Sequence, residues 1–163
     1  MIVDFLNTKC HYPLVKGEYY IYDDDASNEP YFVYENEKWN LNIINNSDCN
    51  VDFYQNDNCL MTQNDLKKCD WVSVFGDNFY FIEAKDVNNA SRRKRQRNEA
   101  IEKFDVTIPY YIKAYPIMID MNFFVIMNFR NSRITRASNK AKEFYFKEKF
   151  NADYIETNCL EFN

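Results

Sequence analysis

The sequence has few of the residues that several common binding sites require. Its 163 residues include two glycines and four prolines, too few for the glycine-rich phosphate loops of Walker and Rossmann sites. The single histidine, His11, excludes a multi-histidine metal site. No apolar run approaches the roughly 18 residues that a membrane span needs. We therefore expect a soluble, cytoplasmic protein that does not engage a membrane.

The five cysteines show no C-x-x-C pair. They are Cys10, Cys49, Cys59, Cys69 and Cys159. An odd number of cysteines without paired spacing argues against a zinc ribbon or a disulfide-stapled secreted scaffold. We expect reduced thiols, with Cys59 and Cys69 serving as buried apolar side chains.

Composition indicates a folded, acidic protein. Hydrophobic residues make up 46% of the chain, aromatic residues 18% and charged residues 28%, which excludes a disordered chain. The net charge of −5 excludes a uniformly basic nucleic-acid-coating protein, but it leaves room for a local basic patch. The length predicts a single domain over residues 1–163.

The first half of the chain is rich in strand-forming residues. Aromatic and β-branched residues predict strands at 18–22 and 51–55, with a short strand at 59–62 after a turn. Residues 31–44 fit both a strand alternation and a helical face, so both interpretations stay open.

The clearest element is a β-hairpin. Alternation over 69–75, a two-residue Gly-Asp turn and an aromatic return strand over 79–85 predict two antiparallel strands. The remaining elements are expected in this order: a helix from about 88–91 to Phe104, strands at 110–119 and 122–129, a helix at 135–149 and an edge strand near 153–161. This order predicts an α/β (α+β) fold with one mixed central sheet flanked by helices.

Two carboxylates and an ammonium meet in this hairpin. The turn pairs Asp70 with Glu83, and Lys85 points to the same face because it lies two residues further along the strand. Adjacent carboxylates repel each other unless a hard cation such as Mg²⁺ lies between them. The carbonyl of Ala84 offers another oxygen ligand, and a lysine beside the pair can activate water during phosphodiester hydrolysis.

These residues resemble a known family. Asp70, twelve intervening residues and Glu83-Ala84-Lys85 after an aromatic run resemble the PD-(D/E)xK nuclease superfamily, especially its small bacterial members. Cys69 stands where the family's motif has proline. The resemblance implies a restriction-endonuclease-like fold, with a motif core at about 50–130. Many members also carry a glutamate on a preceding helix, for which Glu35 and Glu37 are candidates if 31–44 is helical.

The resemblance also implies chemistry. Asp70, Glu83 and Lys85 would be catalytic, and Asp70, Glu83 and the Ala84 carbonyl would bind Mg²⁺ or Mn²⁺. The expected activity is metal-dependent hydrolysis of phosphodiester bonds in nucleic acid, most of all DNA, in phage defence or mobile-element processing. A homodimer or a larger complex is the expected form for cutting duplex DNA.

A basic segment follows the hairpin. Ser91-Arg92-Arg93-Lys94-Arg95-Gln96-Arg97 places five cations at a helix start, where the helix dipole disfavours them. Binding to phosphate would explain them. We therefore expect Arg92, Arg93 and Arg95 to contact nucleic acid beside the metal site, and the resemblance points to Gln96 as a further contact. The opposing interpretation is a solvated helix face paired with nearby acidic residues.

Two other functions compete with the nuclease. One is a catalytically inactive nucleic-acid-binding or assembly subunit that keeps the same fold. The other is a regulator whose acidic surface binds a protein partner. If the three central residues formed only an exposed ion pair, they would contribute little to stability or to catalysis.

Overall fold

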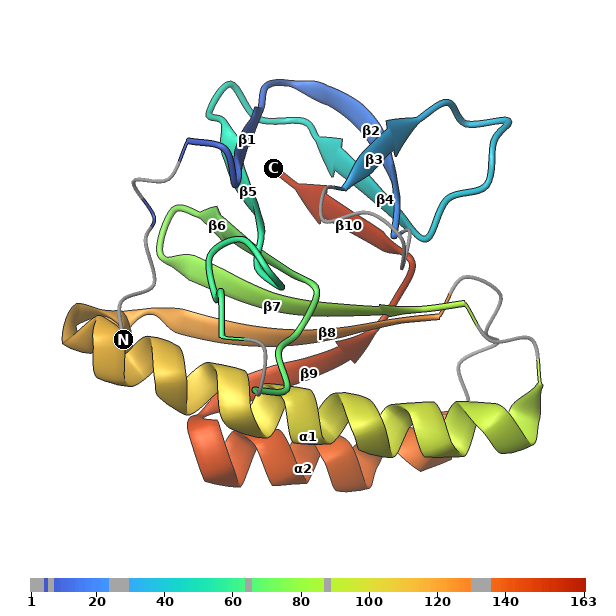
Figure 1. The fold of residues 1–163 in the computed structure, drawn as a ribbon, viewed down its shortest axis with the longest axis vertical. Helices are drawn as coiled ribbons and strands as arrows, with labels where there is room; N and C mark the ends of the chain where they lie inside the picture. The colour runs from blue at the N-terminus through green and yellow to red at the C-terminus, as the bar shows by residue number, and fades with distance from the viewer. Residues whose placement is uncertain (1–4, 6–7, 24–29, 64–65, 87–88, 130–135) are drawn as a thin grey trace.

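Helices and sheets lie in layers (Figure 1). The structure is a computed structural model that describes residues 5, 8–23, 30–63, 66–86, 89–129 and 136–163. Within these ranges the chain is mixed α+β, with two α-helices and two mixed β-sheets. The first half consists of β1 (His11–Leu14), β2 (Gly17–Tyr22), β3 (Tyr31–Val33), β4 (Leu41–Asn45), β5 (Val51–Gln55) and β6 (Trp71–Phe75). The second half consists of β7 (Asn78–Lys85), α1 (Ala90–Ala114), the 3-10 helix η1 (Pro116–Asp120), β8 (Asn122–Phe129), α2 (Arg136–Phe150), β9 (Ala152–Glu156) and β10 (Cys159–Phe162).

The larger sheet has six strands in the order β1-β5-β6-β7-β8-β9. Its strands from β1 to β7 pair antiparallel, whereas β7, β8 and β9 are parallel to each other. Parallel neighbours need crossover connections, and α1 and α2 supply them. Both helices lie against the same face of this sheet (Figure 1).

The opposite face of the large sheet meets a second sheet instead of helices. This sheet has four strands in the order β10-β4-β2-β3. Trp71 and Ile82 of the large sheet share a buried cluster with Leu41 and Phe162 of the small one. The expected single mixed sheet flanked by helices is therefore corrected: there are two sheets, and helices cover one face of the larger sheet while the smaller sheet covers the other.

Helix α1 is much longer than expected. Residues 110–119 do not form a strand, because α1 continues to Ala114 with Pro109 inside it, and η1 follows. A continuous apolar run fits a buried strand and a buried helix equally well. The spacing of Phe104, Ile108 and Tyr111, all fully buried, now identifies it as a helical face. Among the described residues no helix is long and apolar enough to cross a membrane.

Two shorter segments also bear on the predictions: one lacks its expected strand, and for the other the structure decides between two interpretations. The expected strand at 59–62 is reduced to one isolated bridge between Asp57 and Met61. The ambiguous segment 31–44 contributes β3 and the start of β4, with a turn between them. Glu35 and Glu37 lie exposed in this turn and not on a helix, so neither fits the helical glutamate of the family pattern.

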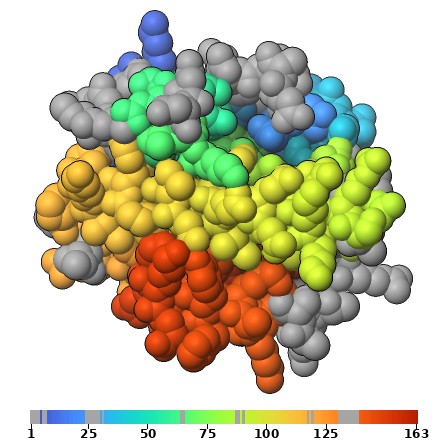
Figure 2. Space-filling model, turned by 60° about the horizontal axis from the view of Figure 1, so that its bottom comes forward, coloured from blue at the N-terminus to red at the C-terminus, as the bar shows by residue number. Residues whose placement is uncertain are grey.

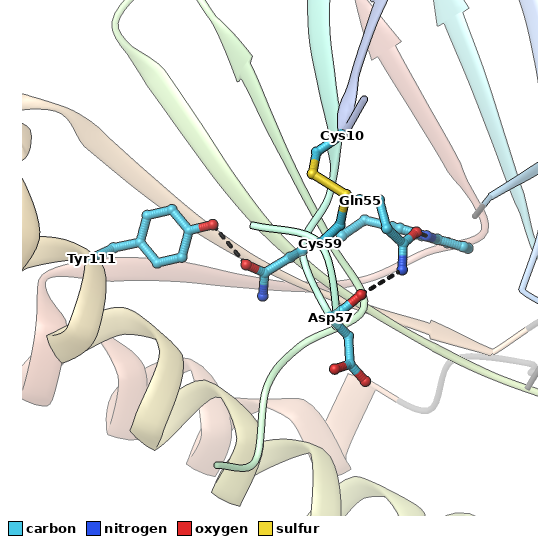
Figure 3. The surroundings of a disulfide bond; sticks show 7 residues. Cys10, Gln55, Asp57, Cys59 and Tyr111 are labelled. Carbon is cyan, nitrogen blue, oxygen red and sulfur yellow. Dashed lines mark hydrogen bonds between the residues drawn. A yellow bond between two sulfur atoms is a disulfide. The ribbon is translucent and has the colours of Figure 1, made fainter. Parts of the chain in front are cut away.

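A disulfide joins Cys10 to Cys59, which corrects the expectation that all thiols are reduced. It ties the residue just before β1 to the loop that follows β5 (Figure 3). From the other side, the hydroxyl of Tyr111 on α1 donates a 2.7 Å hydrogen bond to Asn56 Oδ1 in the same loop. Cys69 is buried, as expected, and is free.

The disulfide should stabilise the fold measurably. Replacing Cys10 and Cys59 together by alanine removes a cross-link between residues 49 positions apart, which should lower the free energy of unfolding by about 2–4 kcal/mol. Urea denaturation without reductant measures this loss, and Cys49→Ala, at an exposed free thiol, is the matched control. Equal urea midpoints for the double variant and the control would contradict the disulfide.

Candidate active site

The hairpin register places Asp70 opposite Glu83. Trp71 pairs with Ile82 at the start of β6, so Asp70, the residue before this strand, faces the next residue of β7. Glu83 is fully buried and Asp70 is 7% exposed. Both lie on the face of the sheet that α1 covers, because a contact to α1 joins them, as described below.

Backbone groups hold Asp70 in place. The N–H of Ala84 donates a 2.8 Å hydrogen bond to Asp70 Oδ2. The N–H groups of Asn56 and Asp57 donate to the Asp70 carbonyl at 3.0 and 3.3 Å. The N–H and C=O of one strand residue point to the same side, so the Ala84 carbonyl also faces the Asp70 side of β7. The three expected metal-binding groups are thus brought together.

A buried lysine supports the loop that carries these contacts. The side chain of Lys68 is 4% exposed, and its ammonium lies 2.9 Å from Asp57 Oδ1. The same ammonium donates hydrogen bonds to three further oxygens, namely Asn58 Oδ1, the Met61 carbonyl and the Gln63 carbonyl. Oxygen atoms of one short loop therefore surround a single cation, which fixes the backbone next to Asp70.

Sequence analysis missed Lys103, a central residue of the site. Its ammonium, extending from the middle of α1, lies 3.1 Å from Asp70 Oδ1 and 2.6 Å from Glu83 Oε1. The ammonium of Lys85 lies 2.5 Å from the same Glu83 oxygen. The sequence held one signal for Lys103. It lies three residues after Ala100 and four before Thr107, so it shares the face of the helix on which these two residues are buried.

Burial determines the electrostatics of the pair. Desolvation, together with the negative charge of Asp70, raises the pKa of Glu83 to about 8, although the ammonium groups of Lys103 and Lys85 oppose this shift. For Lys103, desolvation lowers the pKa, but Asp70 and Glu83 outweigh it, and the net pKa lies above its ordinary value. Lys103 is therefore a permanent cation between the two carboxylates.

One carboxylate oxygen remains unpartnered. The contacts of Glu83 Oε1 are ion-pair contacts without the angles of a hydrogen bond, and Oε2 has no hydrogen-bond partner among the described residues. No group of three or more His, Cys, Asp and Glu side chains within the described ranges could hold a metal ion. Mg²⁺ does not need one, because it is commonly held by one or two carboxylates and several waters. Asp70, Glu83 and the Ala84 carbonyl fit such an ion.

The residue of α1 that contacts the carboxylates lies in the middle of the helix and not in its basic start. Lys103, which reaches the carboxylates, lies 7 residues after Gln96 and 11 after Arg92, or about 10 and 16 Å along the helix axis at 1.5 Å per residue. The middle of α1 therefore contacts the carboxylates. The placement of the helix start beside the metal site stays a prediction.

The basic residues themselves have different surroundings. Arg92 and Arg95 are exposed, and Arg95 forms a 3.4 Å ion pair with Glu99. Arg93 and Gln96 are half-buried. Figure 2 shows α1 on the molecular surface beside α2, with its first turns at one end of this face. Lys103 and the basic residues thus lie on one helix, with Lys103 near its middle and the basic residues near its start.

Arg97 belongs to the interior of the fold. Its guanidinium donates hydrogen bonds of 2.8 and 3.0 Å to the two carboxylate oxygens of Glu156 in β9. It also lies over the ring of Phe129, 4.9 Å from the ring centre. Tyr154 donates to the same carboxylate at 2.8 Å. This arginine joins α1 to the sheet and does not form part of a phosphate-binding surface.

The raised pKa of Glu83 predicts a pH-dependent stability. Because its folded pKa of about 8 exceeds its ordinary 4.5, protonation favours the folded state. This contribution is complete below pH 4.5 and is lost as the pH rises to 8, by at most about 1.4 kcal/mol per pH unit. Glu83→Gln, which cannot titrate, is the control. Urea unfolding from pH 5 to 8 should show wild type losing stability relative to this variant, and a constant difference would contradict the raised pKa.

Comparison with known proteins adds no family to this description. A search against protein-family models, curated proteins and solved structures finds no match for the chain. The activity of the site has to be inferred from its own residues and their chemistry.

Proposed function

We propose that the protein is a metal-dependent nuclease that hydrolyses phosphodiester bonds, with DNA as its substrate. The observation that carries this proposal is that Asp70 and Glu83 both contact the ammonium of Lys103. The ammonium of Lys85 also contacts Glu83. This arrangement of carboxylates and lysine matches the chemistry of the PD-(D/E)xK nucleases that the hairpin sequence resembles.

The order of elements around the site supports a restriction-endonuclease-like core within this proposal. An antiparallel hairpin of β6 and β7 carries the acidic residues, and the crossover helix α1 leads to a parallel neighbour, β8. The site lies at the end of β7 from which α1 departs. The four-stranded sheet on the opposite face would then be an addition to this core.

Each site residue has a distinct role in the proposed reaction. Asp70, Glu83 and the Ala84 carbonyl would hold the metal, which supplies Lewis acidity toward a phosphoryl oxygen. The side chain of Lys85 is 19% exposed, so its ammonium reaches from the buried glutamate toward solvent. There it can orient the attacking water or neutralise the charge that develops on the phosphate.

The exposed arginines supply affinity for the nucleic-acid backbone. Arg92 and Arg95 point into solvent from the start of α1, where backbone N–H groups also favour anions. Since this surface is more than one helical turn from the carboxylates, a substrate that contacts both must extend along α1. A nucleic-acid strand meets that requirement, whereas a small phosphate ester does not.

The alternative is an inactive nucleic-acid-binding or assembly subunit with the same fold. The ion pairs of Lys103 favour it, because an ammonium already satisfies the carboxylate pair. Cleavage in the presence of metal distinguishes the two functions, since the inactive subunit would bind nucleic acid and leave it intact.

Substitution of the two charged residues of β7 tests the nuclease. Glu83→Gln removes the charge that a hard cation requires, and it should abolish Mg²⁺-dependent cleavage while preserving binding of nucleic acid. Lys85→Met should lower the cleavage rate by about 100-fold or more while preserving metal binding. Cleavage of a plasmid and of a single-stranded oligonucleotide over a series of Mg²⁺ and Mn²⁺ concentrations measures both effects.

Glu161→Gln is the matched control, because Glu161 is exposed on β10 in the other sheet. It should cleave like wild type. The nuclease proposal fails if the wild-type protein cleaves neither substrate with either metal, or if Glu83→Gln cleaves as fast as the control.

The basic helix start makes a separate prediction. Changing Arg92, Arg93 and Arg95 to glutamine should weaken binding to all nucleic-acid sequences and reduce the slope of log affinity against log salt by about two to three units. Folding should be unaffected or slightly improved, because cations near a helix N-terminus are unfavourable.

A charge-matched control isolates this surface. Changing the exposed Lys16, Lys113 and Lys147 to glutamine removes the same charge from other parts of the surface. Fluorescence anisotropy over a salt series compares the two triple variants. If their salt slopes agree, the arginines do not contact phosphates.

A further inference from the structure

The position that a shared metal ion would occupy is held by a residue of the protein. Asp70 and Glu83 converge on one point, and the ammonium of Lys103 lies there, 3.1 and 2.6 Å from the two carboxylates. Lys85 contacts the same Glu83 oxygen, but among the described residues only Lys103 bridges the two carboxylates. We propose that Lys103 is the resident counter-ion of the carboxylate pair and that a divalent metal binds by displacing it.

The ammonium of Lys103 and a metal ion cannot both bridge the two carboxylates. A Mg²⁺ ion binds oxygen at about 2.1 Å, closer than the ammonium contacts, so an ion bound to both Asp70 Oδ1 and Glu83 Oε1 would overlap the lysine nitrogen. Two cations also repel each other strongly in a buried site, where water screens little of their charge. The ammonium must therefore leave before a metal can bind both Asp70 and Glu83.

The Lys103 side chain can move from the carboxylates toward solvent. Lys103 is 22% exposed, whereas Glu83 is fully buried, so part of the lysine side chain already reaches solvent. Its flexible four-carbon stem lets the ammonium swing outward without movement of the helix. The helix is held by other residues, because Phe104, Ile108 and Tyr111 are fully buried beneath it.

The unpartnered oxygen gives the metal an advantage over the lysine. In the structure Glu83 Oε2 has no hydrogen-bond partner in the described part of the chain, so Lys103 leaves part of this carboxylate unsatisfied. A divalent ion carries twice the charge of an ammonium and can take both oxygens of one carboxylate. Lys103 then acts as a positioning residue that holds the two carboxyl groups in place in the metal-free protein, at a cost in metal affinity.

Metal binding tests this inference, which rests on the proposed metal site but needs no measurement of cleavage. Lys103→Met keeps the unbranched stem and removes the charge, so Mn²⁺ should bind at least tenfold more tightly than to wild type. Lys113→Met, at an exposed position on the same helix, is the matched control and should bind like wild type. Electron paramagnetic resonance of free Mn²⁺ measures the affinities, and the double variant Lys103→Met, Glu83→Gln should lose the gain.

A second measurement on the unsubstituted protein covers the case in which Lys103→Met does not fold. With isotope-labelled lysine, the NMR signals of the Lys103 side chain should shift on titration with Mg²⁺ toward those of exposed lysines. The Lys113 signals should stay in place. A Lys103 signal that is unchanged at saturating Mg²⁺ overturns the displacement.

The outcomes separate this inference from the nuclease. Equal Mn²⁺ affinities for wild type and Lys103→Met, with metal-dependent cleavage retained, overturn the displacement and leave the nuclease standing. Tighter binding by Lys103→Met without cleavage by any variant supports the displacement and overturns the nuclease. Absence of Mn²⁺ binding by wild type and Lys103→Met alike overturns both.

Discussion

Two carboxyl groups buried side by side need a partner of opposite charge, and this requirement organises the centre of the molecule. The register of β6 and β7 brings Asp70 next to Glu83, and neither carboxylate has enough contact with water to be stabilised by solvent. Lys103 supplies the cation from α1 and so joins the helix to the sheet at a defined point. The buried residues Phe104, Ile108 and Tyr111 fix the position of the helix, and Lys103 adds a charged contact from that helix to the two carboxyl groups.

Local signals in the sequence were sufficient for the hairpin and for the two acidic residues. The Gly76-Asp77 turn determines the pairing of its two strands, so the approach of Asp70 to Glu83 follows from neighbouring residues alone. The strands at 18–22, 51–55 and 122–129 and the helix near 135–149 were also predicted, because each is a continuous run with one clear pattern. Residue type and spacing determine such elements without reference to the rest of the chain.

Contacts between residues far apart in the sequence could not be predicted in the same way. Lys103 meets Asp70 across 33 residues, and Cys10 meets Cys59 across 49, so neither contact leaves a local pattern. The end of α1 was misplaced for a related reason. The apolar run at 110–119 fitted a strand, whereas packing of Ile108 and Tyr111 in the core keeps the chain helical past Pro109. In each case tertiary packing, and not local preference, determined the result.

The loop around Lys68 has a consequence of its own. Loops rich in Asp and Asn often need calcium to hold their carbonyl oxygens together, and such loops change shape when the ion is removed. Here the protein's own ammonium occupies the centre of the oxygen cage, so the support behind Asp70 keeps its shape at any concentration of free metal. The backbone next to Asp70 therefore owes its shape to a covalently attached ammonium and not to an ion that could dissociate.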